Sequence, residues 1–337
     1  MKIAIAGAGA VGSVIAAYLS RGGNQISVLV RGAHLAAIRE HGLTVFTRGE
    51  RLISHPAASD DANELGLHDL VIVTAKAQSL AAMAPAIARL RKPGAPVIAA
   101  QNGLPWWYFY GQRLTGRGAE LSGRPLDRVD PDGVAWRLIG GEGTIGCTIR
   151  MAAEVVSPGV VTHAGPLRLT LGAPDISAPP HGLAEAAEVL QSAGIETVIT
   201  DQIRRAVWEK LQLNISTGPV SVLTGATLGE IRDGEGMESL LGVLMQEARD
   251  VAATLDVDVS APAADWLARG GGNAGHKPSM LQDFEAGRPL ELDSVVTAVI
   301  DLAHITAVPV PTIEAMLTLV RLKIACRDAA QANHVKI

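Results

Sequence analysis

The sequence predicts an α/β protein in which an N-terminal parallel sheet covered by helices precedes an all-α C-terminal domain. In the first 100 residues, short apolar runs rich in Val and Ile alternate with segments of helical periodicity, and this alternation is typical of a parallel sheet. After Thr200 the strand-like runs stop and long helical periods follow. The 36 glycines and the hydrophobic content of 48% suit tight turns and close contacts between helices and strands.

Length and composition narrow the class of protein. A chain of 337 residues corresponds to roughly two domains and can bury a large core. Lys and Arg number 29 against 34 Asp and Glu, and this net charge of −5 argues against nonspecific binding of nucleic acid. The cysteines are Cys147 and Cys326, too few for a disulfide framework or a four-cysteine zinc site. We expect reduced thiols, although one bridge between the two stays open.

The N-terminal domain is predicted at 1–200. Its first strands are expected at 2–6, 25–30, 69–74 and 96–100, and the helices between them at 11–21, 33–40 and 78–90. Because helices connect successive strands, the strands should run parallel, with helices on both faces of the sheet. Short strands at 144–149, 159–163, 168–172 and 196–199 and a helix at 183–192 would complete the domain.

The segment 104–143 interrupts this pattern. It begins with five consecutive aromatic residues, Trp106 to Tyr110, and continues as a Gly-, Arg- and Asp-rich stretch with little periodicity. We interpret it as an insertion whose aromatic cluster packs on the domain. A substrate lid is the alternative.

The C-terminal domain is predicted at 201–337, with helices near 203–217, 236–255, 278–287, 293–306 and 311–329 and a flexible loop at 269–273. Two uncharged stretches, 3–20 and 211–229, contain glycines or a proline, so neither is expected to span a membrane. We expect a soluble, cytoplasmic protein with no membrane or nucleic-acid partner. The apolar C-terminal helices could support a homodimer.

The strongest motif is Gly7-x-Gly9-x-x-Gly12, which lies between the first predicted strand and the first helix. Gly7 permits a tight turn, Gly9 lets the backbone approach a pyrophosphate, and Gly12 allows the helix to pack closely on the sheet. Together with the intervening Ala10 and Val11, the turn would present helix N-terminal N–H groups to the phosphates. The motif predicts a dinucleotide site in a Rossmann-type domain.

Arg31 follows the second predicted strand, where NAD-binding proteins usually carry an acidic residue for the ribose 2′-hydroxyl. A cation at this position suits a 2′-phosphate. The sequence therefore favours NADPH/NADP, and the alternative is an ordinary exposed arginine.

A candidate for the chemistry lies on the first C-terminal helix. Lys210 and Asn214 are four residues apart and share one helix face, among apolar neighbours. The Lys210 ammonium could donate to a substrate carbonyl and stabilise a developing alkoxide. A lysine that reaches the surface or pairs with Glu209 explains the pattern equally well.

With these residues in view, the chain resembles the ketopantoate reductase (2-dehydropantoate 2-reductase) family over nearly its whole length. The motifs that carry the resemblance are Gly7–Gly12 with Arg31, Thr74-Ala75-Lys76, Gln101-Asn102-Gly103, Trp208-Glu209-Lys210 with Asn214, and Ser279-Met280-Leu281-Gln282-Asp283 followed by Glu291-Leu292-Asp293. Each motif is weak by itself, but their order and spacing together are specific.

The resemblance implies an NADPH-dependent reduction of a branched 2-keto acid, first of all 2-dehydropantoate to pantoate in pantothenate biosynthesis. It implies that Lys210 is the general acid and that Glu291 holds the hydroxyl or carbonyl end of the substrate. It also implies that Asn214 and Ser279 hydrogen-bond the substrate. Asn102 and Lys76 would lie where cofactor and substrate meet.

One departure from the family pattern concerns the substrate. Gly218 stands before Pro219 where the family commonly has a second asparagine. A same-family reductase of a bulkier 2-keto acid therefore stays open, as does a non-catalytic protein that senses NADP.

Other catalytic groups fit less well. His163, His276 and His304 lack the arginine and acid partners of a lactate-type dehydrogenase, and we interpret them as structural or surface residues. No close group of His, Asp and Glu has metal-ligand spacing, so no metal is predicted.

Overall fold

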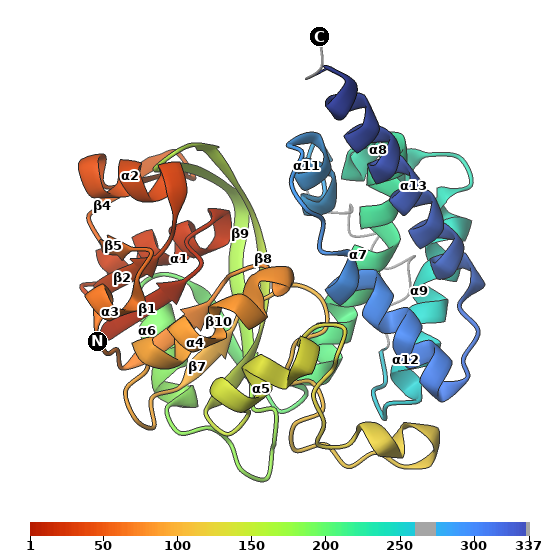
Figure 1. Cartoon of the computed structure of the whole chain (residues 1–337), viewed down its shortest axis with the longest axis horizontal. Helices are drawn as coiled ribbons and strands as arrows, with labels where there is room; N and C mark the ends of the chain where they lie inside the picture. The colour runs from red at the N-terminus through yellow and green to blue at the C-terminus, as the bar shows by residue number, and fades with distance from the viewer. Residues whose placement is uncertain (260–273, 335–337) are drawn as a thin grey trace. The chain divides into compact units, whose positions relative to one another are not determined.

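The computed structural model describes residues 1–259 and 274–334. Its contacts divide the chain into two compact units (Figure 1), and we describe each by itself. Unit 1 comprises Met1–Arg113 and Leu121–Ala206, and unit 2 comprises Leu114–Glu120 and Val207–Ile337. The predicted loop at 269–273 lies outside the described residues.

Unit 1 is built on a ten-stranded sheet of order β4-β3-β9-β8-β7-β6-β1-β2-β5, with β10 paired to β9. The strands are β1 (Lys2–Ala6), β2 (Gln25–Leu29), β3 (Leu43–Thr47), β4 (Glu50–Ser54), β5 (Ala57–Ser59), β6 (Leu70–Val73), β7 (Val97–Ala99), β8 (Thr144–Ser157), β9 (Val160–Gly172) and β10 (Glu196–Thr200). The helices are α1 (Ala10–Arg21), α2 (Gly32–His41), α3 (Ala62–Leu65), α4 (Leu80–Leu90), α5 (Val134–Leu138) and α6 (Leu183–Ser192). Three 3₁₀ turns are η1 (Ala77–Ser79), η2 (Gly116–Leu121), which begins in the unit 2 segment, and η3 (Pro131–Gly133).

Both faces of the parallel part of the sheet are buried, as predicted. Ile3 and Ile5 of β1 belong to one buried cluster with the apolar residues of α1 and α6. Ala4 and Ala6, which alternate with them, are also fully buried. Because successive residues of a strand face opposite sides of the sheet, β1 is covered on both sides.

The sheet differs from the prediction where it becomes mixed. The strands β3, β4 and β5 were not predicted, and two pairs, β3–β4 and β8–β9, are antiparallel. The predicted strands at 159–163 and 168–172 form the single strand β9, because it pairs with β8 along most of its length. Irregular register in this ribbon, between Arg150 and Ala152 and again near Ser157, lets it bend.

The aromatic cluster is part of the core of unit 1. The side chains of Trp106, Trp107, Tyr108 and Phe109 are fully buried. The Arg204 guanidinium donates hydrogen bonds to the backbone carbonyl oxygens of Tyr108, Tyr110 and Pro174 at 2.7, 2.6 and 2.7 Å. These contacts favour a packed loop over a lid.

Unit 2 is helical in its described part. It contains most of α7 (Ile203–Thr224), then α8 (Leu228–Asp233), α9 (Met237–Ala253), α11 (Ser279–Glu285), the π-helical turn η4 (Asp293–Thr297), α12 (Ala298–Thr306) and α13 (Pro311–His334). The buried Glu247 of α9 accepts hydrogen bonds from the N–H groups of Thr312 and Ile313 and so caps α13. No helix in the described part of the chain is long and apolar enough to cross a membrane.

The helix α7 is longer than the predicted helix near 203–217, which stopped before Gly218 and Pro219. Hydroxyl side chains surround the proline, and Ser221 donates to the Gly218 carbonyl oxygen at 2.7 Å. Thr217 likewise donates to the Leu213 carbonyl oxygen at 2.7 Å. Such side-chain hydrogen bonds satisfy backbone groups near an internal proline, so the helix continues.

Candidate active site

The glycines of the Gly7–Gly12 turn have distinct geometric roles. Gly7 has a φ of +104°, and a Cβ there would lie 2.6 Å from the Ala75 nitrogen. A Cβ on Gly12 would lie 2.5 Å from the Thr74 hydroxyl oxygen. A Cβ on Gly9 would meet nothing within 4 Å, so this glycine borders open space. Gly7 and Gly12 therefore serve the fold, and Gly9 leaves room for a ligand.

The turn is held against the end of β6. The Thr74 hydroxyl donates to the Gly7 carbonyl oxygen at 2.8 Å, and the Ala75 N–H donates to the Ala6 carbonyl oxygen at 3.1 Å. The residue before α1, Gly9, supplies no side-chain cap. The first N–H groups of α1, near Ala10 and Val11, therefore have no capping side chain, which is the arrangement that binds phosphate.

Arg31 follows β2 and precedes α2. Its side chain is exposed, and within residues 1–259 and 274–334 its guanidinium has no hydrogen-bond or ion-pair partner. A cation in this position can receive an anionic group without first breaking an existing contact.

Lys76 and Asn102 lie at the same edge of the sheet as the glycine turn. Ala6 pairs in register with Val73, and Val73 pairs with Ala99, so the carboxyl ends of β1, β6 and β7 are level. Lys76 follows β6 and Asn102 follows β7, and both are half-buried. Ligands of open α/β sheets bind at this edge.

In unit 2, Lys210 and Asn214 lie one turn apart on α7 and are both half-buried, whereas Trp208 and Leu211 are buried. Gly218 is one turn further on. A Cβ there would meet the Met280 thioether of α11 at 3.2 Å, so α11 packs against α7 at this residue.

The other two predicted substrate residues belong to neighbouring segments of unit 2. Ser279 is the first residue of α11 and is exposed. Glu291 is half-buried and lies two residues before the η4 turn, and the Val295 N–H of that turn donates to the Glu291 carbonyl oxygen at 3.2 Å. π-helical turns are rare and often occur at functional sites.

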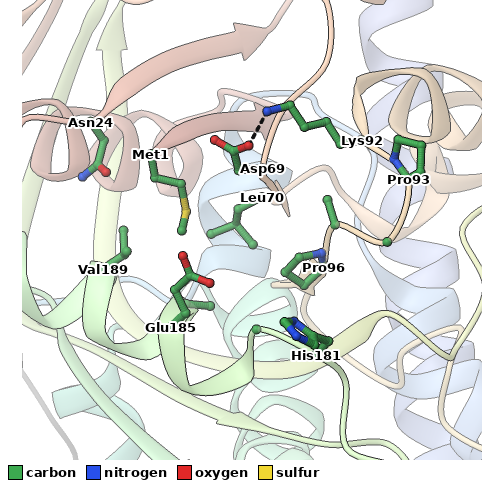
Figure 2. A pocket seen from close by; sticks show the side chains of 14 residues that line it. Met1, Asn24, Asp69, Leu70, Lys92, Pro93, Pro96, His181, Glu185 and Val189 are labelled. Carbon is green, nitrogen blue, oxygen red and sulfur yellow. Dashed lines mark hydrogen bonds and ion pairs between the residues drawn. The ribbon is translucent and has the colours of Figure 1, made fainter.

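A cavity of about 620 Å³ lies at the opposite, amino edge of the sheet in unit 1 (Figure 2). Its lining includes Met1, Leu70 and Pro96, and the ion pair between Asp69 and Lys92 lies at its margin. None of the predicted site residues lines it, so this cavity is not the predicted cofactor site.

The remaining sequence candidates take structural contacts or lie apart from the predicted site. The buried His163 is within hydrogen-bond distance of the Thr47 hydroxyl, at 2.8 Å, and burial lowers its pKa. His304 pairs with Glu314 on the surface at 2.8 Å. Cys147 and Cys326 are free thiols. Among the described residues, no group of three or more His, Cys, Asp or Glu could hold a metal ion.

Two residues near the glycine turn escaped the sequence analysis. Ser13 is fully buried in the first turn of α1, and its hydroxyl is 3.2 Å from His34 Nε2 of α2. The only signal in the sequence was a serine within an otherwise apolar helix directly after Gly12.

A glycine turn between strand and helix, at the edge of a largely parallel sheet, defines the class of dinucleotide-binding proteins. Comparison with known proteins gives the family within that class. Residues 3–108 match the family described as "Ketopantoate reductase PanE/ApbA", and residues 202–324 match its C-terminal counterpart. The chain belongs to the ketopantoate reductase family, whose members are nicotinamide-dinucleotide-dependent reductases acting on CH–OH groups.

Individual relatives agree over nearly the full length. The 2-dehydropantoate 2-reductase of Mesorhizobium japonicum is 40% identical over 95% of this chain and 97% of its own. A solved chain from Ralstonia solanacearum MolK2, described provisionally as a ketopantoate reductase, is 36% identical with a TM-score of 0.88, covering 97% of this chain and 98% of its own. A D-mandelate dehydrogenase solved with NADH and anilino(oxo)acetate shares the fold, with a TM-score of 0.80, 22% identity, and coverage of 97% and 99%.

Proposed function

We propose that the protein catalyses the NADPH-dependent reduction of 2-dehydropantoate to pantoate, as a cytoplasmic enzyme of pantothenate biosynthesis. The observation that carries this proposal is the 40% identity to a 2-dehydropantoate 2-reductase over 95% of the chain. The motifs that carry the resemblance are present in this chain, apart from the second asparagine, which Gly218 replaces. We further propose that residues 1–200 bind the cofactor and residues 201–337 the substrate.

The residues of unit 1 fit a dinucleotide. Gly9 borders open space, the first turn of α1 has no capping side chain, and Arg31 is exposed and unpaired in the described part of the chain. A pyrophosphate would accept hydrogen bonds from the N–H groups of the turn. The Arg31 guanidinium would pair with a 2′-phosphate, so this residue supports a preference for NADPH over NADH.

In the proposed mechanism, NADPH held at the glycine turn would supply the hydride that the ketone carbon accepts. Lys210 donates a proton to the ketone oxygen, and its positive charge stabilises the alkoxide before that transfer. Glu291 orients the hydroxyl or carbonyl end of the substrate, and its negative charge favours the protonated form of Lys210. Asn214 and Ser279 donate hydrogen bonds to the substrate, and Ser279 lies near the carboxylate.

A bulkier 2-keto acid is the alternative substrate within the same reaction. The observation in its favour is that Gly218 faces the flexible Met280 thioether on the face of α7 that carries Lys210 and Asn214. A thioether can move to admit a larger apolar group more easily than a fixed polar side chain can.

The test is NADPH consumption by the purified protein with a panel of 2-keto acids. We expect 2-dehydropantoate to give the highest kcat/KM. Faster turnover of a larger keto acid would favour the alternative substrate, and tight NADPH binding without turnover of any keto acid would favour a sensor.

Lys210→Ala should remove turnover while NADPH binding persists, because Lys210 is assigned to the proton and not to the cofactor. Lys323→Ala, at an exposed position of α13, is the matched control and should keep full activity. An unchanged rate in Lys210→Ala would remove this lysine from the mechanism.

A further inference from the structure

A chain of polar contacts links three separate segments of unit 1 behind the glycine turn. The Gly159 N–H, in the turn between β8 and β9, donates to Nδ1 of His34 at 2.9 Å. Nε2 of the same ring lies 3.2 Å from the Ser13 hydroxyl. The Ser13 hydroxyl in turn donates to the Ala8 carbonyl oxygen at 3.2 Å.

The direction of these hydrogen bonds fixes the tautomer of His34. Because Nδ1 accepts from a backbone N–H, the proton of the neutral ring must be on Nε2. Nε2–H then donates to Ser13, whose own hydroxyl proton is committed to Ala8. Each group donates and accepts in one consistent direction, so the chain of contacts is fully satisfied with a neutral imidazole.

The last acceptor of the chain lies inside the glycine turn. Both polar groups of the peptide between Ala8 and Gly9 are hydrogen-bonded. Its carbonyl oxygen accepts from the Ser13 hydroxyl, and its N–H donates to the Gly7 carbonyl oxygen at 2.8 Å. Ala8 and Ser13 are almost completely buried, at 1% and 0% exposed, so water cannot replace a lost bond. Without Ser13 in place, the peptide plane that leads into the first N–H groups of α1 would be free to tilt.

We propose that His34 is a positioning residue for the dinucleotide, which acts through Ser13 to fix the orientation of the Gly7–Gly12 turn. This inference rests on the proposed function, because it assigns the pyrophosphate to that turn. His34 itself does not contact the cofactor in this assignment. Its effect is on cofactor affinity, because preorganised N–H donors bind an anion more tightly than donors that must first be ordered.

The experiment measures NADPH dissociation constants and steady-state kinetics for four variants of the full chain and one control variant. Losing one hydrogen bond of this kind costs about 1 kcal/mol, or about fivefold in affinity. Ser13→Ala and His34→Leu should therefore each weaken NADPH binding about fivefold to tenfold. The value of kcat at saturating NADPH should change less than about twofold, because the reacting groups are elsewhere.

Two further variants separate positioning from general destabilisation. The double variant should bind no more weakly than either single one, because both remove the same chain of contacts. His34→Gln should restore most of the affinity, since a side-chain amide can accept from Gly159 and donate to Ser13. His41→Leu, an exposed histidine on the same helix, is the control and should bind NADPH normally.

The outcomes distinguish this inference from the function on which it rests. Unaltered NADPH binding in both Ser13→Ala and His34→Leu would overturn the positioning role and leave the reductase intact. Additive losses in the double variant, or no rescue by glutamine, would also overturn it. Failure of the wild-type protein to bind any nicotinamide dinucleotide would instead overturn the proposed function.

Discussion

Replacing Arg204 by alanine should destabilise unit 1 more than replacing an exposed charged residue by alanine would. The guanidinium donates three hydrogen bonds of 2.6 to 2.7 Å to backbone carbonyl oxygens. It also lies 5.9 and 5.7 Å from the ring centroids of Trp107 and Tyr108. Burial lowers its pKa, but an arginine stays charged at neutral pH.

The magnitude follows from these contacts. A hydrogen bond from a charged donor contributes about 1.5–3 kcal/mol, and each buried carbonyl left without a partner costs about 1–3 kcal/mol. Because neighbouring effects do not add fully, we expect Arg204→Ala to lower the free energy of unfolding by about 3–5 kcal/mol. Arg204→Lys should recover only part of this, since an ammonium cannot reach three carbonyl oxygens in a planar fork.

The assay is urea unfolding followed by tryptophan fluorescence, because Trp106 and Trp107 are fully buried beside this contact. Arg89→Ala is the matched control. The Arg89 side chain is exposed on α4, so its loss should cost less than about 0.5 kcal/mol. If Arg204→Ala unfolds at the same urea concentration as the control, the hydrogen bonds from Arg204 to the aromatic segment do not stabilise unit 1.

Three further predictions concern the cofactor. Arg31→Asp should weaken NADPH binding much more than NADH binding. Arg89→Ala, at an exposed position of α4, is the control and should change neither affinity. Equal losses for both cofactors would show that Arg31 does not bind the 2′-phosphate. Gly12→Ala should lower the melting temperature, because its Cβ would lie 2.5 Å from the Thr74 hydroxyl oxygen. Gly9→Ala should fold normally, because a Cβ there meets nothing within 4 Å. Similar melting temperatures for the two variants would contradict a structural role for Gly12 that Gly9 does not share. Burial lowers the pKa of His34 from its ordinary value, so the ring stays neutral to a lower pH than a free histidine does. NADPH affinity, measured by titration, should fall as the pH drops through this lowered pKa. The same fall in His34→Gln would assign it to another group.

Much of unit 1 could be predicted because its strands are buried on both sides. The run Lys2–Ala6 and the turn after it were recognisable from apolar residues and glycines alone. The strand β4 escaped because it is the last strand at one end of the sheet order, where Ile53 is 52% exposed and charged residues interrupt the pattern. The strand β3 is mostly buried, but its five residues include two threonines, so its apolar run is short. A strand that faces solvent has no continuous apolar signature.

The residues of the candidate site likewise differ in whether their contacts join positions that are close or distant in the sequence. The glycine turn is local in the sequence, since its residues lie within six positions of one another. The chain of contacts through His34 joins residues that are 21 and 125 positions apart. No spacing rule connects such residues, because the connection depends on how α1, α2 and the β8–β9 turn pack.

Gly7, Lys76 and Asn102 are distant in the sequence, but a simple rule of sheet topology brings them to one edge. Each follows a buried strand, and strands joined by helices run parallel, so their carboxyl ends meet at one edge. Only the family resemblance predicted that Lys76 and Asn102 lie near the cofactor, and the register of the strands explains why they share an edge with Gly7. Lys210, Asn214 and Gly218 share a face of α7 for an equally simple reason, their spacing of four, but what that face meets depends on where α11 packs. The substrate is for this reason harder to infer from the sequence than the cofactor, since helix packing has no counterpart to the register of a parallel sheet.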